Sequence, residues 1–230
     1  MSSTNTACRF VLFIFVLMNP IALMASQQLP DGFVYLEEVV PSIRLDMRYF
    51  SEDNFTGKPV DGYLKPRGII TRQAAMALGN VQDELVPFGL GIKIFDAYRP
   101  QRSVDNFVRW AADLSDTKTK VQYYPNVAKQ DLFREGYIAA KSSHSRGSTV
   151  DLTIMELSSG AELDMGSPFD FFGPISWPES TIVQPAKLAY RLLLKTLMMK
   201  YGFKPYAQEW WHFTLVGEPY PDTYFDFPVE

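Results

Sequence analysis

The segment Lys141-Ser142-Ser143-His144-Ser145-Arg146-Gly147-Ser148-Thr149-Val150-Asp151-Leu152-Thr153 joins a polar stretch to a strand-like one and holds one of only two histidines in 230 residues. From residue 149 onward apolar and polar residues alternate, which predicts a strand with Asp151 on its polar, cleft-facing side. The other histidine lies in Glu209-Trp210-Trp211-His212-Phe213. Each histidine therefore has a carboxylate close by in the sequence.

These two segments supply His144, Asp151 and His212 as candidate metal ligands, with Glu209 as a spare carboxylate. Three protein ligands of this kind are typical of a hydrolytic zinc site, in which water takes the fourth position. The plainer alternative is that each histidine is an ordinary hydrogen-bonded residue. The scarcity of histidine and the neighbouring carboxylates favour the metal site.

Length and composition predict one domain. A chain of 230 residues that is 47% hydrophobic can bury a substantial core. Acidic residues number 26 against 22 basic ones, and the basic residues form no cluster. No nucleic-acid partner is therefore expected, and a small partner fits better.

The first 25 residues differ from the rest and predict a signal peptide, with the functional domain spanning residues 26–230. Arg9 precedes the apolar run Phe10–Met18, and small residues follow at Ala25 and Ser26. The run is short for a membrane span, so we expect cleavage after Ala25 or Ser26, a secreted or periplasmic protein, and no stable membrane association afterwards. An uncleaved membrane anchor is the alternative.

The only cysteine, Cys8, would be removed with this segment. The mature protein would then contain neither a disulfide nor a reactive thiol. A cysteine-free product suits an oxidising compartment.

Periodicity along the remaining chain predicts both strands and helices. Alternation predicts a strand over Ile43–Tyr49, and turn residues over 54–63 predict a long loop. Helical spacing follows Thr71, which is a candidate helix cap, and ends at Pro87 and Gly89. A helix is also expected from Pro185 to Met199.

A short strand over 91–96 should deliver Arg99 to a corner before the next helix, and side chains in such corners often face clefts. The fold class that follows is α+β. We expect a single domain with a small, mostly antiparallel sheet flanked by helices, and with zinc in a cleft between the sheet and the loops.

The spacing of Glu209 and His212 raises a geometric difficulty. Their aromatic neighbours favour a strand, in which residues three apart point to opposite faces. If both side chains are to reach one metal ion, the strand must be irregular between Trp210 and His212.

The motif Ser142-x-His144-x-x-Gly147-x-x-x-Asp151, followed by Glu209-x-x-His212, resembles the zinc signature of D-alanyl-D-alanine peptidases related to the hedgehog N-terminal domain and the lysostaphin-type enzymes. Within that group the chain is most similar to the VanX-type D-alanyl-D-alanine dipeptidases, from about Phe33 to the C-terminus. Four further segments carry this similarity: 53–63, 96–100, 145–148 and 164–170.

The resemblance implies a role for each matching residue. His144, Asp151 and His212 would bind one Zn²⁺ per chain. Glu209 would be the general base that takes a proton from water and passes it to the leaving amine. Arg99 would stabilise the oxyanion, although a salt bridge with Asp96 would be an ordinary structural role for this arginine.

The resemblance also implies how the ends of a D-Ala-D-Ala substrate are held. Asp170 and Tyr49 would bind the free ammonium group, which leaves an N-acylated peptide without a partner. Ser142 and Tyr63 are candidates for the other end of the dipeptide, and both could equally be loop hydrogen-bonding residues.

Two alternative functions keep the same metal site. The first is a D,D- or L,D-carboxypeptidase that trims peptidoglycan stem peptides outside the cell. The second is a zinc-stabilised binding module without catalysis. Asp170 argues against the first alternative, and the presence of both Glu209 and Arg99 argues against the second.

Overall fold

Two long, mostly buried strands form the centre of the main sheet. In β4 (Leu90–Asp96) and β5 (Thr149–Glu156) nearly every residue is buried, because both faces of the sheet are covered. The five strands are ordered β2-β4-β5-β7-β6, where β2 is Arg44–Leu45, β6 is Phe203–Tyr206 and β7 is Glu209–Leu215. Only the pairing of β2 with β4 is parallel.

A second, two-stranded antiparallel sheet consists of β1 (Phe33–Tyr35) and β3 (Ile69–Thr71). The helices are α1 (Leu36–Val39), α2 (Arg72–Leu85), α3 (Gln101–Ala112), α4 (Lys120–Tyr123) and α5 (Pro185–Lys200). Short 3-10 turns lie at Arg48–Phe50, Val86–Phe88, Lys129–Asp131, Ser143–Arg146 and Pro174–Ser176. The computed structural model describes residues 29–230, so the predicted signal peptide lies outside the described part.

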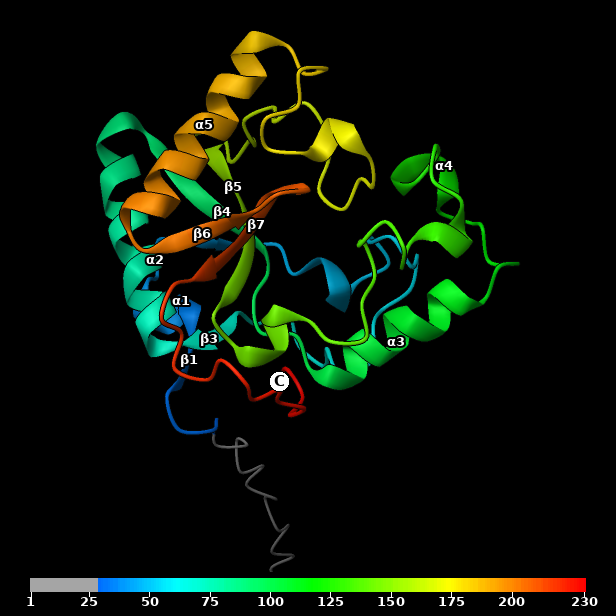
Figure 1. Ribbon diagram of the computed structural model, residues 1–230. Coiled ribbons are helices and arrows are strands. Elements are labelled where there is room, and N and C mark those ends of the chain that lie inside the picture. Colours follow the sequence, from blue (N-terminus) through cyan, green and yellow to red (C-terminus); the bar gives the residue numbers. More distant parts are fainter. Residues whose placement is uncertain (1–28) are drawn as a thin grey trace, which may run out of the picture.

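The sheet is a middle layer between two groups of helices (Figure 1). Helices α2 and α5 contact each other and pack against the sheet, while α3 and α4 lie on the opposite side of the molecule with the long loops. The largest fully buried side chains are aromatic: Trp211, Tyr49, Tyr98, Tyr124, Phe95, Phe203 and Phe213. Among the described residues, no helix combines the length and the hydropathy needed to cross a bilayer.

The architecture confirms the predicted α+β class and the mostly antiparallel sheet. The expected helices are present as α2, α3 and α5, and the expected strands as β4 and β5. The prediction of a strand over Ile43–Tyr49 is largely wrong, because only Arg44–Leu45 pairs with β4 and the chain then turns into the 3-10 turn at Arg48–Phe50. In the turn, more buried and less buried side chains still alternate from Met47 to Phe50, which explains why the sequence pattern resembles that of a strand.

Thr71 precedes α2 as expected, but its side chain does not cap the helix. Its hydroxyl instead lies 2.7 Å from the hydroxyl of Ser148. This contact ties the small sheet to the start of β5.

Gly147 makes the sharp connection between the Ser143–Arg146 turn and β5. It has a left-handed backbone with φ of 83°, a conformation that costs an ordinary L-residue about 1–2 kcal/mol. The ring of Phe33 occupies the space that a Cβ atom would need. The Gly147 carbonyl oxygen accepts a 2.7 Å hydrogen bond from the Thr71 N–H. Backbone geometry and close packing therefore both require glycine here.

We expect Gly147→Ala to lower the free energy of unfolding by about 2–5 kcal/mol, since backbone strain adds to overpacking against Phe33. Gly160→Ala is the matched control, because Gly160 has φ of 72° and no atom lies within 4 Å of the position that a Cβ would take. That control should lose only about 1–2 kcal/mol. Urea unfolding of both variants measures the difference, and equal losses would contradict this account.

Candidate active site

His144 is held in a fixed orientation beneath the surface. It lies in the Ser143–Arg146 turn and is fully buried. Its Nδ1 donates a 2.7 Å hydrogen bond to the carbonyl oxygen of Ala97. In the neutral imidazole this leaves Nε2 unprotonated and free to act as a ligand. Burial also lowers the pKa of His144, which favours the neutral form.

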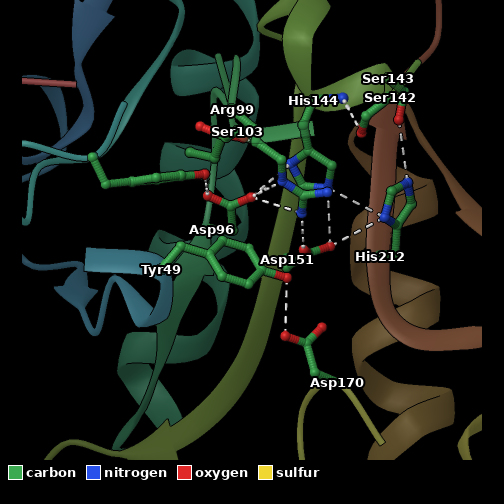
Figure 2. A network of polar contacts seen from close by, with 12 residues as sticks. Tyr49, Asp96, Arg99, Ser103, Ser142, Ser143, His144, Asp151, Asp170 and His212 are labelled. Carbon is green, nitrogen blue, oxygen red and sulfur yellow. Dashed lines mark hydrogen bonds and ion pairs between the residues drawn. The ribbon is translucent and has the colours of Figure 1, made fainter. Parts of the chain in front are cut away.

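Strand register brings the other two candidate ligands to the same place. Asp151 on β5 is directly opposite His212 on β7, and side chains at directly opposed positions lie on the same face of a sheet. Asp151 Oδ1 lies 3.1 Å from His212 Nδ1 and 3.3 Å from His144 Nε2. The three residues therefore converge, as Figure 2 shows.

The donor set fits a divalent metal ion such as Zn²⁺. One ligand atom from each of the three residues lies within 4.8 Å of the others. Asp151 Oδ1 is buried without a hydrogen-bond partner, although a buried carboxylate oxygen normally has one. Burial raises the pKa of Asp151, but the two histidines outweigh burial and hold that pKa below its usual range. A buried, ionised and unpartnered oxygen beside two imidazoles is what a tetrahedral zinc site requires.

Glu209 reaches the same site because β7 bulges. The pairing of β7 with β6 skips the residues between Glu209 and Phe213, which confirms the predicted irregularity. The bulge turns Glu209 toward His212, so that Glu209 Oε2 lies 3.4 Å from His212 Nδ1. Burial raises the pKa of Glu209 to about 7. A carboxyl group with such a pKa can both accept and release a proton near neutral pH.

Arg99 is fixed between two carboxylates at the corner after β4. Its Nη2 lies 2.8 Å from Asp96 Oδ2 and 3.4 Å from Asp151 Oδ2. The guanidinium also lies over the ring of Tyr49, 4.9 Å from the ring centroid. Arg99 therefore forms the expected salt bridge with Asp96 and also lies next to the candidate metal ligand Asp151.

Tyr49 and Asp170 form a second polar pair in the same cavity. The Tyr49 hydroxyl donates a 2.9 Å hydrogen bond to Asp170 Oδ2, and both side chains are buried. Burial raises the pKa of Asp170 well above its ordinary range, and the charge of Asp151 adds to this effect. The charge of Arg99 offsets this effect only in part, and within the described part of the chain no cationic side chain lies in salt-bridge contact with Asp170.

The structure separates the two remaining candidates. The Ser142 side chain accepts a hydrogen bond from the His144 N–H and also lines the cavity. Tyr63 does not line the cavity, and its hydroxyl donates a 2.6 Å hydrogen bond to Asp96 Oδ1. Its position supports Asp96.

One cavity of about 270 Å³ is lined by most of the candidate residues, namely Tyr49, Arg99, Ser142, Asp151, Asp170, Glu209 and His212, whereas the fully buried His144, like Tyr63, is not part of its wall. This volume is below the roughly 300–1,000 Å³ typical of sites for drug-sized ligands, so the cavity suits a smaller molecule. Its lining includes Tyr49, Phe55, Arg99, Phe107, Tyr137, Ser142, Asp151, Asp170, Phe172, Glu209, Trp211 and His212.

Sequence reasoning did not assign two residues of the site. Asp96 anchors Arg99, and its Oδ2 lies 3.4 Å from His144 Nδ1. Ser143 Oγ lies 3.3 Å from His212 Nε2. Both residues are close neighbours of assigned ones, so the available signal was their proximity in sequence to Arg99 and His144.

Comparisons with a family model and with individual proteins give the same result over most of the chain. The family model described as D-ala-D-ala dipeptidase matches residues 30–230. A D-alanyl-D-alanine dipeptidase of Streptomyces coelicolor is 47% identical over 197 residues, which are 86% of this chain and 98% of that protein. A protein of the same name from Enterococcus faecalis is 46% identical over 199 residues, again 86% of this chain and 98% of that protein.

Among solved structures, the chain is similar to a zinc-bound mutant of the vancomycin-resistance D,D-pentapeptidase VanY. The TM-score is 0.41 at 15% identity, with 67% of this chain and 77% of the other covered.

Proposed function

Since the chain belongs to the D-Ala-D-Ala dipeptidase family of metallopeptidases, we propose that it is a zinc enzyme that hydrolyses free D-alanyl-D-alanine to two molecules of D-alanine. The observation that carries this proposal is the single small cavity shared by two groups of residues. Asp151, His212 and Glu209 form one group, to which the buried His144 is joined by its contacts with Asp151 and His212, and the Tyr49–Asp170 pair forms the other.

Zn²⁺ would be held by His144 Nε2, Asp151 Oδ1 and His212 Nδ1, one ion per chain. When bound, zinc supplies a Lewis acid that polarises a carbonyl group and makes water more acidic. The protein contributes ligands whose orientation is already fixed, because Ala97 holds one histidine and the sheet register holds the other two ligands.

Glu209 is the proton carrier in this proposal. It accepts a proton from the attacking water as the oxygen forms a bond to the scissile carbonyl carbon. It then delivers that proton to the nitrogen as the C–N bond breaks, which releases the second D-alanine as a free amine. Its raised pKa suits both steps.

Arg99 is the group that stabilises the developing negative charge on the carbonyl oxygen. Its guanidinium is anchored by Asp96 and the ring of Tyr49, so it is fixed before the substrate arrives. A fixed donor aimed at such an oxygen typically contributes about 3–4 kcal/mol to transition-state stability.

The Tyr49–Asp170 pair would bind the free ammonium group of the dipeptide. A substrate ammonium provides the cation that the buried Asp170 carboxyl lacks. An N-acyl group brings no charge and leaves this carboxyl without a partner, which supports a dipeptidase over a carboxypeptidase. Ser142, whose side chain lines the cavity next to the ligands, is the candidate for the substrate carboxylate.

A zinc-stabilised binding module would explain the metal ligands alone. It would need neither a carboxyl group with a pKa near neutrality nor an anchored arginine in the same cavity. The presence of both groups supports catalysis.

Metal binding and proton transfer can be separated with two variants. Asp151→Ala removes a ligand, so we expect it to lose zinc on dialysis and to lose activity. Glu209→Gln should keep one zinc per chain while kcat falls by about 10²–10⁴-fold, the usual contribution of a general base. Elemental analysis by mass spectrometry and the release of free D-alanine measure the two effects. Activity retained in Glu209→Gln would refute the assigned role.

Substrate selection can be tested with Asp170→Asn. Loss of one charged hydrogen bond of about 1.5–3 kcal/mol should lower kcat/KM for D-Ala-D-Ala by roughly 10–100-fold. The rate for N-acetyl-D-Ala-D-Ala, which has no ammonium group, should not fall. Asp164→Asn is the control because Asp164 belongs to the same loop but is 66% exposed and paired with Lys187. A wild-type preference for the acylated peptide would indicate a carboxypeptidase.

Export is the remaining part of the proposal. The apolar run Phe10–Met18 and the small residues at 25–26 support a signal peptide, and the family match begins only at residue 30. Intact mass spectrometry of the protein recovered from the extracytoplasmic fraction should give a chain starting at Ser26 or Gln27. A retained Met1 would contradict cleavage.

A further inference from the structure

The ammonium-binding carboxylate sits on a loop, in contrast to the metal ligands. Asp170 belongs to the segment that joins β5 to α5, drawn in yellow in Figure 1. It is the one non-glycine residue with positive φ in the described chain, at 59°. Aspartate tolerates this conformation better than most L-residues, but it is still less favourable than a right-handed one. The contacts that hold the loop in this path therefore matter for the position of Asp170.

Arg191 on α5 makes such contacts, because its side chain binds the backbone of the loop. Its side chain is buried, with 2% of the residue exposed. Nε donates to the carbonyl oxygen of Met165 at 2.6 Å, and Nη1 donates to those of Ile175 and Trp177 at 2.9 and 2.8 Å. One guanidinium thus binds the loop on both sides of Asp170.

Two serine hydroxyl groups continue this hydrogen-bond network from Arg191 toward Asp170. Arg191 Nη2 donates to Ser167 Oγ at 3.2 Å, and that hydroxyl lies 2.9 Å from Ser176 Oγ. Ser176 in turn donates a 2.6 Å hydrogen bond to the carbonyl oxygen of Phe171, the residue after Asp170. The network therefore ends one residue from the carboxylate.

The same network contacts the catalytic strand. The indole Nε1 of Trp210 donates a 3.0 Å hydrogen bond to Ser167 Oγ, and Trp210 is the residue next to Glu209 on β7. Ser167 is thus shared by the helix, the loop and the strand.

A buried arginine whose observed hydrogen bonds go to carbonyl and hydroxyl oxygens is costly, since charge burial is only partly offset by neutral acceptors. Burial lowers the pKa of Arg191 to about 10, so the side chain still carries its charge at neutral pH. A planar fork of five donors on three nitrogen atoms binds three carbonyl groups and a hydroxyl group here, whereas lysine has three donors on a single nitrogen atom and an apolar side chain has none. This capacity suits a residue that fixes the path of an irregular loop.

We propose that Arg191 is a positioning residue for substrate selection: it holds the loop at Met165–Trp177 so that Asp170 faces Tyr49 and the enzyme prefers a dipeptide with a free amine. This inference rests on the proposed dipeptidase function. Arg191 itself is not among the residues that line the cavity, so its effect on the substrate is carried by Asp170.

The test compares Arg191→Met, Arg191→Lys and the control Lys195→Met in the full zinc-loaded enzyme. Lys195 lies on the same helix but pairs with Glu179, whose side chain is 81% exposed. Free D-alanine is followed from D-Ala-D-Ala and from N-acetyl-D-Ala-D-Ala. Zinc content and amide hydrogen exchange of the loop are measured on the same samples.

Arg191→Met should lower kcat/KM for D-Ala-D-Ala by about tenfold or more, mainly through a higher KM, because small displacements of a binding group have effects of this size. The acetylated peptide should be cleaved as by the wild type, and zinc content should be unchanged. Amide exchange should accelerate in the loop, including at Phe172, and not in β4 or β5. Arg191→Lys should recover part of the preference, and Lys195→Met should resemble the wild type.

An equal loss for both substrates, or a loosened loop with an unchanged preference, would overturn the proposal. A wild-type enzyme that does not cleave the free dipeptide would overturn the proposed function, and the inference about substrate selection would fail with it. The two failures are distinguishable, because hydrogen exchange reports whether Arg191 holds the loop without any substrate.

Discussion

The burial of opposing charges in the middle of the sheet is the constraint on which the site depends. Three adjacent strands place Asp96, Asp151 and His212 side by side. Each ion removed from water costs several kcal/mol unless partners compensate it. Asp96 is compensated by the Tyr63 hydroxyl and the Arg99 guanidinium. Asp151 faces two imidazoles, and its Oδ1 has no hydrogen-bond partner. A metal ion bound between Asp151 and the two histidines would compensate this remaining charge.

This constraint also explains how Arg99 can combine its ion pair with Asp96 and the catalytic role proposed for it. A guanidinium that only stabilised an oxyanion would be an unpaired buried cation in the free enzyme, and a guanidinium that only paired with Asp96 could point away from the cavity. The corner after β4 lets it contact Asp96 and Asp151 while it lies over Tyr49. In the proposed mechanism, the electrostatic balance of the resting site and the stabilisation of the transition state therefore use the same group.

The sequence predicted the parts of the molecule that follow from local periodicity and from rare residues. The apolar spacing in α2 and α5 is a helical repeat that needs no distant partner, and it led to the correct elements. The scarcity of histidine pointed to His144 and His212, which the structure brings together. The three-residue spacing of Glu209 and His212 even anticipated the bulge in β7, because Glu209 could not otherwise face His212.

The predictions failed or stayed open where tertiary contacts decide the conformation. Residues Ile43–Tyr49 alternate in burial as a strand does, but part of the segment is a 3-10 turn that carries Tyr49 to Asp170. Nothing within the segment signals a partner far along the chain. Tyr63 belongs to a segment that resembles the dipeptidases, yet its hydroxyl donates a hydrogen bond to Asp96 and does not line the cavity. A motif identifies which residues matter, and only packing determines which of them face the substrate.

The two halves of the site rest on different kinds of support, and this difference has a consequence for specificity. The proposed metal ligands and Glu209 belong to the sheet or to the tight turn before β5, where a shift of register would destroy the whole arrangement. Asp170 belongs to a loop whose path is set by side-chain contacts from α5 and β7. A loop of this kind can change its contacts without altering the strands beneath it. In the proposed mechanism, the residues that cleave the bond are thus fixed by the fold, whereas the recognition of the free amine proposed for Asp170 is a separate and adjustable feature.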